Sequence, residues 1–472
     1  MPTSTSGRTV PLSPSQELLW EFMSALCPHD PAGSRELTVE HRRLTGALDP
    51  DVLLDALGDV VRRHDPLRLV VDAVGPQPTL RVLDDVEPLV EVVDLSGTPA
   101  SERDARVADL ADADRRRTFD LARGPLWSVT LVRLAAEEHL LLLSFCHLVG
   151  DGWSAKVLVE DLVAAYAARQ SLGPHPAPLD LDWDDLVRLQ RATLPQEPAR
   201  AEYWRSRLAP APPYHAFPFD PPGPDSDLTG EVAYPFRFTP DVSGRLRAVA
   251  WRARTSPYVA LMAAYHVLVA SRTGRTRVVI GTTTLGRDTP ESRRMVGQFT
   301  NDVCVPLVVR PEASLLDVVA EAHAAMAEAA ANVMPFQALA RAVNPSFDEQ
   351  RPWPDNHLFD SYLQSAVPAS APLVLPGLRI EQTWLDDDGR ERPPVVTGRE
   401  VPPGTMPVWV KRGAPIVVVD DDRAGGVMIA NVAFYPAALV DGLVADYVRI
   451  VEALVEDPDR PVGGLVLASA DA

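Results

Sequence analysis

Residues 144–154, SFCHLVGDGWS, are the most informative part of the chain. They continue an apolar run, residues 139–147, whose composition predicts a buried β-strand. The glycines of residues 150–152 end that strand, and residues 153–166 have apolar positions at helical spacing. His147 is therefore expected at the end of a buried strand, next to the start of a helix, where α/β proteins usually place their sites.

An imidazole in that position can do proton chemistry. A neutral, partly dehydrated His147 accepts a proton near pH 7, and the carboxylate of Asp151 either acts on it or is bound elsewhere. The pattern H-x-x-x-D-G fixes only three residues, and a histidine at a strand end is more often structural than catalytic. The motif alone leaves both interpretations open.

Both halves of the chain show the strand and helix signals of an α/β protein. Strands are predicted at residues 126–134 and 139–147 in the first half, and at 276–283 and 303–309 in the second. Helices are predicted at residues 51–63, 153–166, 257–271, 315–332 and 437–455, and a hairpin with strands 415–420 and 427–434. The two halves are thus expected to be similar α/β units, each with a sheet and covering helices.

A proline-rich stretch divides the chain. Residues 210–224 cannot form a helix or a central strand, and they follow a predicted helix at residues 199–208. The 472 residues exceed the size of one core, about 250–300 residues. We therefore expect an N-terminal lobe (1–185), a linking helix and proline-rich linker (186–225), and a C-terminal lobe (226–472). A second irregular stretch, residues 386–406, is expected to be a mobile loop or a functional crossover.

The composition argues against several classes of partner. The chain has 46% hydrophobic residues, as expected of a folded protein, and 45 basic against 65 acidic residues give a net charge of −20. Such a field repels phosphate, which argues against nucleic acid or an anionic membrane as the main partner. All but two of the basic residues are arginines, a bias typical of a GC-rich bacterial genome.

The cysteines and the apolar runs indicate the compartment. Cys27, Cys146 and Cys304 are far apart and form no C-x-x-C pair, so neither a disulfide framework nor a structural zinc site is expected. The first twenty residues lack the pattern of an export signal, and no run approaches 18 apolar residues. We therefore expect a cytoplasmic protein without a metal ion.

The segment CHLVGDG, residues 146–152, resembles HHxxxDG, the signature of condensation domains of nonribosomal peptide synthesis and their acyltransferase relatives. Seven further segments resemble motifs of the same family, in the same order along nearly the whole chain. They are LSPSQELLW (12–20), RHDPLR (63–68), FDLARGPL (119–126), YWRSRL (203–208), IGTTTLGR (280–287), VGQFTN (296–301) and MPF (334–336). Each match is weak alone, but eight in register identify the chain as similar to a condensation domain.

The resemblance implies an α/β fold in which sheets with flanking helices form two chloramphenicol acetyltransferase-like lobes. The lobes would form a V-shaped pseudo-dimer with a tunnel between them. The chain covers one condensation unit and leaves no room for adenylation or carrier domains, so a free-standing enzyme is expected.

The resemblance also implies site residues. His147 matches the catalytic histidine, which lies midway along the tunnel and acts as a base or positions the nucleophile. Gly152 matches the residue whose missing side chain leaves room for the substrate and whose N–H is expected near the reacting carbonyl. Asp151 matches a carboxylate that points away from the substrate and pairs with an arginine, here Arg287. A buried carboxylate needs such a partner, and the pair would hold the turn.

Cys146 departs from the family, which usually has a second histidine at this position. Neighbouring residues of a strand point to opposite faces, so Cys146 and His147 cannot both face one substrate. Cys146 is expected to pack inward as a small apolar residue that supports the site, rather than to act as a reactive thiol.

Four other residues are expected to line the tunnel. Gln364 and Ser365 fall where the family brings a strand end to the acceptor side, and Trp153 and Ser154 directly follow the motif. No G-x-S-x-G surrounds Ser154, so its hydroxyl is expected at a helix start rather than as a nucleophile.

The remaining histidines and acidic runs receive structural interpretations. His266 is expected in a helix core, and His64 and His357 in structural or surface positions. The acidic runs 386–388 and 420–422 are expected to be solvated turns rather than metal sites.

The resemblance implies a transferase that takes an acyl or aminoacyl thioester from the phosphopantetheine arm of a carrier protein. It would pass the acyl group to an amine or hydroxyl of a carrier-bound or free acceptor, giving an amide or an ester, with no bound cofactor. Because the chain is acidic, an acidic carrier would need a local basic patch, for which Arg123 and residues 115–117 are candidates.

Three alternatives remain. A coenzyme A-dependent acyltransferase would share the fold and His147 but would favour a basic tunnel mouth for the 3′-phosphate. An epimerase would have SW at the end of the motif, where this chain has WS followed by Ala155. A non-catalytic domain that recruits partners would be a binding module, and retention of the motif residues together with Arg287 argues against it.

Overall fold

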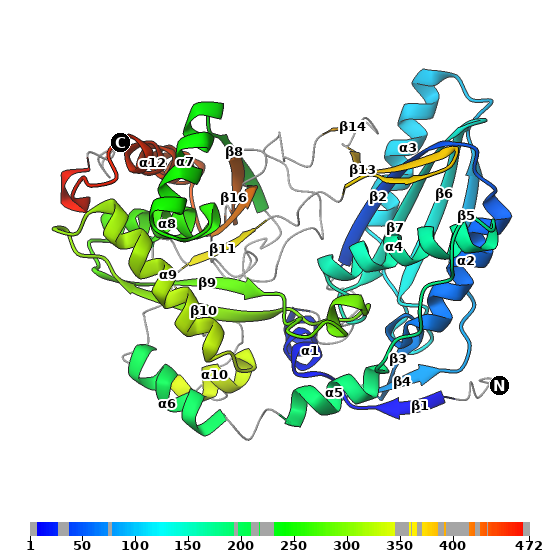
Figure 1. The fold of residues 1–472 in the computed structure, drawn as a ribbon, viewed down its shortest axis with the longest axis horizontal. Coiled ribbons are helices and arrows are strands. Elements are labelled where there is room, and N and C mark those ends of the chain that lie inside the picture. The colour runs from blue at the N-terminus through cyan, green and yellow to red at the C-terminus, as the bar shows by residue number, and fades with distance from the viewer. Residues whose placement is uncertain are drawn as a thin grey trace.

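The computed structural model describes residues 7–26, 37–73, 78–192, 197–208, 217, 231–344, 358–359, 361–365, 371–385, 391–392, 415–420, 425–431 and 433–465. Figure 1 shows them as two halves, each with a sheet and helices around it. Most of the proline-rich linker, most of residues 386–406, and the positions of Cys27 and His357 lie outside the described residues.

Among the described residues, the first half is built on a seven-stranded mixed sheet. Six of its strands follow the order β12-β13-β2-β7-β6-β5, and a seventh, short strand pairs with β13 off this path. Four of its strands come from this half: β2 (Leu37–Gly46), β5 (Val90–Asp94), β6 (Trp127–Ala135) and β7 (Glu138–Cys146). The two predicted strands of this half are β6 and β7, each displaced by one residue from its expected bounds.

The side chains of β7 alternate between two apolar cores, because successive residues of a strand point to opposite faces. Leu141 and Leu143 pack with residues of helices α2 (Pro50–Arg63) and α4 (Gly152–Arg169). Leu140 and Leu142 pack with residues of α3 (Ala100–Arg115) on the other face. The sheet is therefore buried on both sides, which explains why β7 is almost continuously apolar.

The remaining elements of this half surround that sheet. They are α1 (Pro14–Leu26), α5 (Trp183–Ala192), a short 3₁₀ turn (Asp65–Arg68), and a small sheet of β1 (Gly7–Val10), β4 (Thr79–Leu83) and β3 (Leu69–Ala73) in that order.

The second half has a six-stranded mixed sheet with the order β10-β9-β11-β15-β16-β8. Its strands are β8 (Glu231–Arg237), β9 (Arg277–Thr284), β10 (Asn301–Val308), β11 (Ser361–Ser365), β15 (Ile416–Asp420) and β16 (Gly425–Asn431). β15 and β16 form the predicted antiparallel hairpin.

Helices cover both faces of this second sheet as well. One core joins it to α7 (Pro240–Arg252), α8 (Pro257–Thr273), α9 (Leu315–Ala331) and α12 (Ala437–Glu456). A separate core joins the opposite face to α6 (Glu197–Leu208) and α10 (Phe336–Val343). Short 3₁₀ turns lie at Ser292–Arg294 and Val462–Gly464. The predicted α/β class, with two mixed sheets and flanking helices, is confirmed.

The sheets do not follow the order of the chain strictly. β12 (Leu373–Leu375) and β13 (Leu378–Leu385) lie within the range expected for the second lobe, yet β13 pairs with β2 of the first sheet. Leu378 and Ile380 enter the first core. The short β14 (Glu391–Arg392) pairs with β13. The expected division at residues 186–225 groups this hairpin with the second half by sequence, whereas its strand β13 pairs with β2 of the first sheet.

A second segment of the later half also packs on the first core. Met295, Val296 and Phe299 belong to that core, and the ring of Phe299 meets Trp183 edge to face. Gly297 allows this approach, because a Cβ there would lie 2.2 Å from the ring of Trp183. This segment reaches the start of α4, where the candidate site is found.

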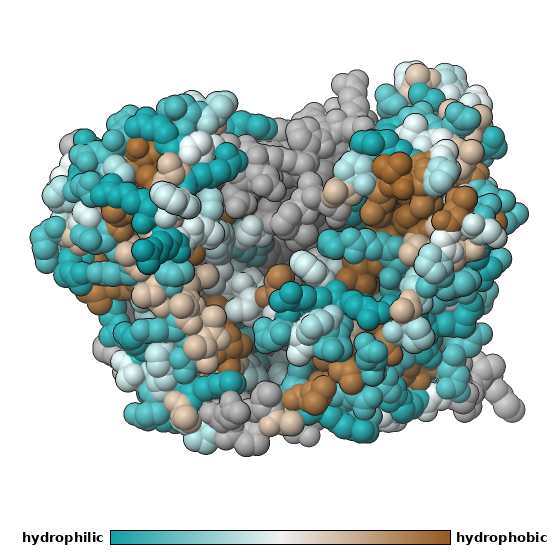
Figure 2. All heavy atoms as spheres, in the orientation of Figure 1, coloured by the Kyte–Doolittle hydropathy of each residue, from teal (hydrophilic) through white to brown (hydrophobic). Residues whose placement is uncertain are grey.

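The surface seen in Figure 2 is mixed, with hydrophilic residues over much of this face and hydrophobic residues gathered in separate patches. Such a mixture is ordinary for globular domains. Among the helices that the structure describes, none has the length and apolar character needed to cross a membrane.

Candidate functional site at the start of helix α4

The site is built around His147, which directly follows β7 and precedes the turn into α4. Its Nδ1 lies 3.2 Å from the carbonyl oxygen of Gly150 and 3.3 Å from Oγ1 of Thr38. A carbonyl oxygen can only accept a hydrogen bond, so Nδ1 carries the proton of the neutral ring. The lone pair is then on Nε2, the nitrogen that a general base needs.

Partial burial favours the neutral form of this ring. Removal of water lowers the pKa of His147, and this effect exceeds the opposing effects of the Gly150 carbonyl and the charge of Asp151. The imidazole is therefore neutral at pH 7, with Nε2 ready to take a proton.

Asp151 is directed away from His147 and into the protein. It is the N-cap of α4: its Oδ1 accepts hydrogen bonds of 2.8 Å from the backbone N–H and the hydroxyl of Ser154. Its Oδ2 accepts from the backbone N–H of Phe299, at 3.2 Å. The carboxylate thus holds the first turn of the helix against the segment from the second half.

Arg287 completes this network. Its Nη2 donates to Asp151 Oδ1 at 2.8 Å, and both side chains are almost fully buried. The guanidinium also donates to the backbone carbonyls of Met295 and Gly297 and lies 3.9 Å above the ring of Phe299. The ion pair that the family resemblance implied is present, with the hydrogen bonds that a buried pair requires.

Ser154 lies in the first turn of α4, as the sequence analysis expected of its hydroxyl. Its side chain is buried between Asp151 and Arg287 and contacts the backbone of Gly297, which donates to Oγ at 3.0 Å. A hydroxyl enclosed in this way supports the network and does not line an open tunnel. The prediction of a helix-start hydroxyl is confirmed.

Gly152 is the first residue of α4, and it is half-buried. The N–H groups of a first helical turn carry partial positive charge, so this position suits a carbonyl oxygen that becomes negative during reaction. Trp153 is half-buried and donates through Nε1 to the carbonyl of Arg293, at 3.0 Å. The indole therefore joins α4 to the segment that carries Arg287.

Gln364 and Ser365 end strand β11, which pairs in parallel with β15 and β9. Figure 1 shows β11 running from the second half toward the middle of the molecule. No described contact joins either residue to His147, so their place in a tunnel wall stays a prediction.

Cys146 is the last residue of β7, and its side chain is buried. It is 3% exposed, pairs across the sheet with Leu37, and belongs to the first apolar core. A buried thiol in an apolar core behaves as a small hydrophobic residue, which fits the expected packing role.

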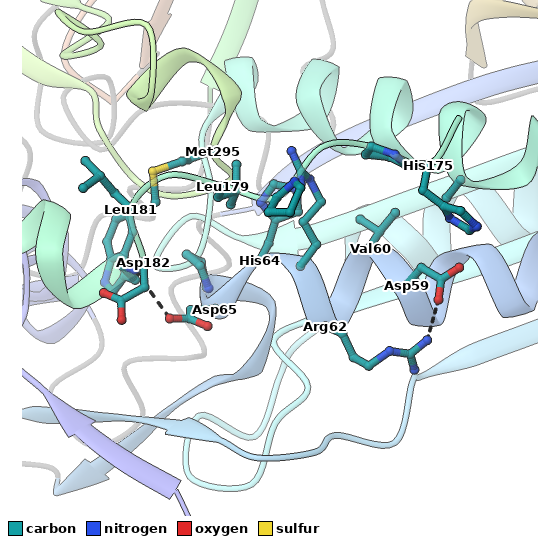
Figure 3. Close-up of a pocket in the computed structure, with 16 residues that line it drawn as sticks. Asp59, Val60, Arg62, His64, Asp65, His175, Leu179, Leu181, Asp182 and Met295 are labelled. Atoms are coloured by element: carbon teal, nitrogen blue, oxygen red, sulfur yellow. Dashed lines mark hydrogen bonds and ion pairs between the residues drawn. The ribbon is translucent and has the colours of Figure 1, made fainter. Parts of the chain in front are cut away.

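His64 has a structural role, one of the two positions that the sequence analysis expected for it. Its Nδ1 accepts from the backbone N–H of Val296 at 3.3 Å, and its Nε2 donates to Asp161 at 2.8 Å. Both nitrogens are occupied, so His64 anchors the segment around Val296 on the first half. His64 also helps to line a pocket of about 480 Å³, together with Asp65, Met295 and other residues (Figure 3).

Within the part of the chain that the structure describes, no group of three or more His, Cys, Asp or Glu side chains could hold a metal ion. The functional contacts that sequence reasoning missed are those of Thr38, Phe299 and the backbone of residues 292–297. Residues 296–299 fall within the VGQFTN segment, but a motif does not show which distant residues its members contact.

Comparison with known proteins identifies the fold around this site. The family described as "Condensation domain" matches residues 6–367. The chain belongs to the condensation-domain family. The phosphinothricin tripeptide synthetases PhsC and PhsB of Streptomyces viridochromogenes are 33% and 31% identical over 70% and 82% of this chain. The chain spans only 30% and 31% of their lengths.

Solved structures agree with this assignment. SgcC5 from Streptomyces globisporus is 27% identical, with a TM-score of 0.77 over 96% of this chain and all of that chain. The X-domain from teicoplanin biosynthesis is 23% identical, with a TM-score of 0.76 over 99% of each chain, and shows the same fold. The two lobes therefore have the expected chloramphenicol acetyltransferase-like architecture. Membership places the condensation domain in nonribosomal peptide synthesis, whose general chemistry is condensation by acyl transfer.

Removing either member of the Asp151–Arg287 pair should destabilise the condensation domain strongly. Asp151→Asn and Arg287→Met each leave the other member of the pair buried without its counter-charge. Each variant should therefore lose about 3–5 kcal/mol in the free energy of unfolding. The double variant should lose less free energy of unfolding than the two single variants lose together. Guanidinium unfolding of the four proteins gives the coupling energy, and exposed Arg123→Met, beside Asp120, is the control, with an expected change below about 1 kcal/mol. A coupling energy near zero would contradict the pairing.

Cys146 should be dispensable as a thiol. Cys146→Ala and Cys146→Ser are expected to keep most of the acyl-transfer activity, because the buried side chain packs in the first apolar core. Treatment of the native protein with a thiol reagent, followed by peptide mass spectrometry, should leave Cys146 unmodified. Rapid inactivation that maps to Cys146 would restore it as a working residue.

Proposed function

We propose that this chain is a free-standing, cytoplasmic condensation enzyme of natural-product biosynthesis. It transfers an acyl or aminoacyl group from the phosphopantetheine thioester of a carrier protein to an amine or hydroxyl acceptor. The observation that carries the proposal is the geometry of His147, whose Nδ1 is bound to the Gly150 carbonyl so that Nε2 is the basic nitrogen.

The reaction needs only groups of this chain and its two substrates. His147 Nε2 takes the proton of the acceptor N–H or O–H as the nucleophile adds to the thioester carbonyl. The C–S bond then breaks, the new C–N or C–O bond remains, and the proton passes from Nε2 to the departing thiolate. The products are the amide or ester and the free thiol of the phosphopantetheine arm, and no redox change occurs.

Gly152 would assist at the same stage. Its backbone N–H lies in the first turn of α4, where the helix dipole favours negative charge on the thioester oxygen. Asp151 and Arg287 would act indirectly, because their hydrogen bonds hold this turn in place beside His147.

A hydroxyl acceptor has specific support. The structure of SgcC5 contains (R)-(-)-1-(2-naphthyl)-1,2-ethanediol, a free small molecule with two hydroxyl groups. At 27% identity over nearly the whole chain, this relative makes a diffusible alcohol the first acceptor to test. Amines of similar size are the second.

The donor is proposed to be carried by a protein, and a local surface must then attract it. The arginines suggested from the sequence do not form a free basic patch. Arg115 is buried, Arg116 lies 2.8 Å from Asp112, and Arg117 lies near the carboxylate of Asp114. Arg123 is exposed, and its guanidinium lies 3.7 Å from the carboxylate of Asp120. The docking surface for the carrier is therefore expected elsewhere on the molecule.

Two alternatives are kept as outcomes of the experiments. One is a coenzyme A-dependent acyltransferase of the same fold. The other is a non-catalytic domain that recruits a carrier or another partner, against which the arrangement of His147 and its neutral ring argues.

Replacement of His147 tests the base. His147→Ala should lose about 10²- to 10⁴-fold in turnover, the usual contribution of general acid–base catalysis, while its circular dichroism spectrum stays unchanged. The exposed His175→Ala is the control and should keep full activity. Product formation is followed by mass spectrometry with a loaded carrier protein and a panel of alcohols and amines. An unchanged rate in His147→Ala would refute the assignment.

Comparison of donors tests the delivery of the substrate. The same acyl group should react far faster on a carrier protein than on coenzyme A at equal concentration, because contacts with the carrier supply binding energy at the reacting centre. The advantage should shrink as salt is added if charges guide the docking. Equal or better use of the coenzyme A thioester would move the enzyme into the alternative acyltransferase class.

A further inference from the structure

The register of β2 and β7 brings Thr38 beside His147. Thr38 lies directly opposite Phe145 in this antiparallel pair, and directly opposed residues share a face of the sheet. His147 follows Phe145 by two positions and lies on that same side. Thr38 is thus the diagonal neighbour of His147, and its Oγ1 lies 3.3 Å from Nδ1.

Two oxygens therefore surround one ring nitrogen. The Gly150 carbonyl comes from the turn after β7, at 3.2 Å, and the Thr38 hydroxyl comes from a different strand. A single acceptor leaves the imidazole free to rotate about that bond. Two acceptors on separate elements fix the plane of the ring, because Nδ1–H is shared between them as a three-centre hydrogen bond.

We propose that Thr38 is a positioning residue for His147: its hydroxyl oxygen shares Nδ1–H with the Gly150 carbonyl, fixes the ring plane and keeps Nε2 as the basic nitrogen. The proposal rests on the proposed function only in giving Nε2 a substrate proton to accept. The tautomer and the orientation of the ring are properties of the resting protein.

The choice of neutral oxygens has a chemical consequence. A carboxylate at Nδ1 would raise the pKa of the imidazole and favour a charged resting ring. The hydroxyl and the carbonyl carry no net charge, so the partly buried ring stays neutral at pH 7. When Nε2 takes a proton, both oxygens bind the more acidic Nδ1–H more strongly and stabilise the imidazolium.

Other charged groups on the neighbouring elements are accounted for separately. Asp151 caps α4 and is paired with Arg287. Glu40 follows Thr38 on the same face of β2 and lies beside Arg42, and burial raises the pKa of Glu40 to about 7. A pH profile of the enzyme can therefore contain a contribution from Glu40, which the variant Glu40→Gln removes.

The first test measures the ring itself. Nitrogen-15 NMR of histidine-labelled protein, with the His147 signal assigned through His147→Ala, should show Nδ1 protonated and Nε2 unprotonated. Thr38→Val, which keeps the shape but not the oxygen, should lower the pKa of His147 and populate the other tautomer. Thr38→Ser should restore both readouts, and Thr45→Val, an exposed threonine of the same strand, should change neither.

The second test measures catalysis with the same variants. Thr38→Val should lower kcat about 2- to 10-fold, the loss expected for one neutral hydrogen bond, with little change in KM. The acid limb of its pH–rate profile should move to lower pH, Thr38→Ser should recover the rate, and Glu40→Gln should not reproduce the shift.

The two tests separate two kinds of failure. If Thr38→Val matches Thr45→Val in the nitrogen-15 spectra, or if Glu40→Gln alone moves the acid limb, the role of Thr38 is refuted. If the spectra respond as expected while His147→Ala keeps full activity, the positioning is correct and the proposed catalytic role of His147 is wrong.

Discussion

One buried carboxylate connects the parts on which the site depends. Asp151 caps the first turn of α4 through Ser154, accepts the N–H of Phe299, and pairs with Arg287. The helix start comes from the first half and the other partners from the second, so neither half can build this corner alone. Loss of the carboxylate would remove the N-cap of α4 and leave the charge of Arg287 in the interior without its counter-charge.

The chemistry of His147 depends on the fact that the Asp151 carboxylate does not bind its ring. Asp151 satisfies its hydrogen bonds elsewhere, and the imidazole meets only neutral oxygens at Nδ1. Burial can then lower the pKa of the ring without a compensating full charge in contact. The result is a base that is unprotonated at pH 7 and fixed in orientation. A carboxylate at Nδ1 could fix the orientation of the ring, but it would also raise the pKa of the imidazole.

Local patterns predicted the elements around the site well, since β7, the turn and α4 are contiguous and each has a clear apolar period. Long-range contacts were not predictable in the same way. Thr38 and His147 are 109 positions apart, and Asp151 and Arg287 are 136 apart; only the family resemblance joined the second pair. Ser154 directly follows the motif, but its partners Arg287 and Gly297 are more than 130 positions away in the sequence. The pairing of β13 with β2 is likewise a contact between segments far apart in the chain, which no local pattern specifies.

The crossover of β13 matters for anyone who would recombine condensation domains. A chimera joined in the proline-rich linker would take β2 from one parent and β13 from the other, so the two strands would have to match in register and side-chain size across the junction. A mismatch would leave β2 with unpaired backbone groups at a new sheet edge, a surface prone to aggregation. The natural exchange unit is therefore the whole pair of lobes, or a single lobe together with the hairpin that completes its sheet.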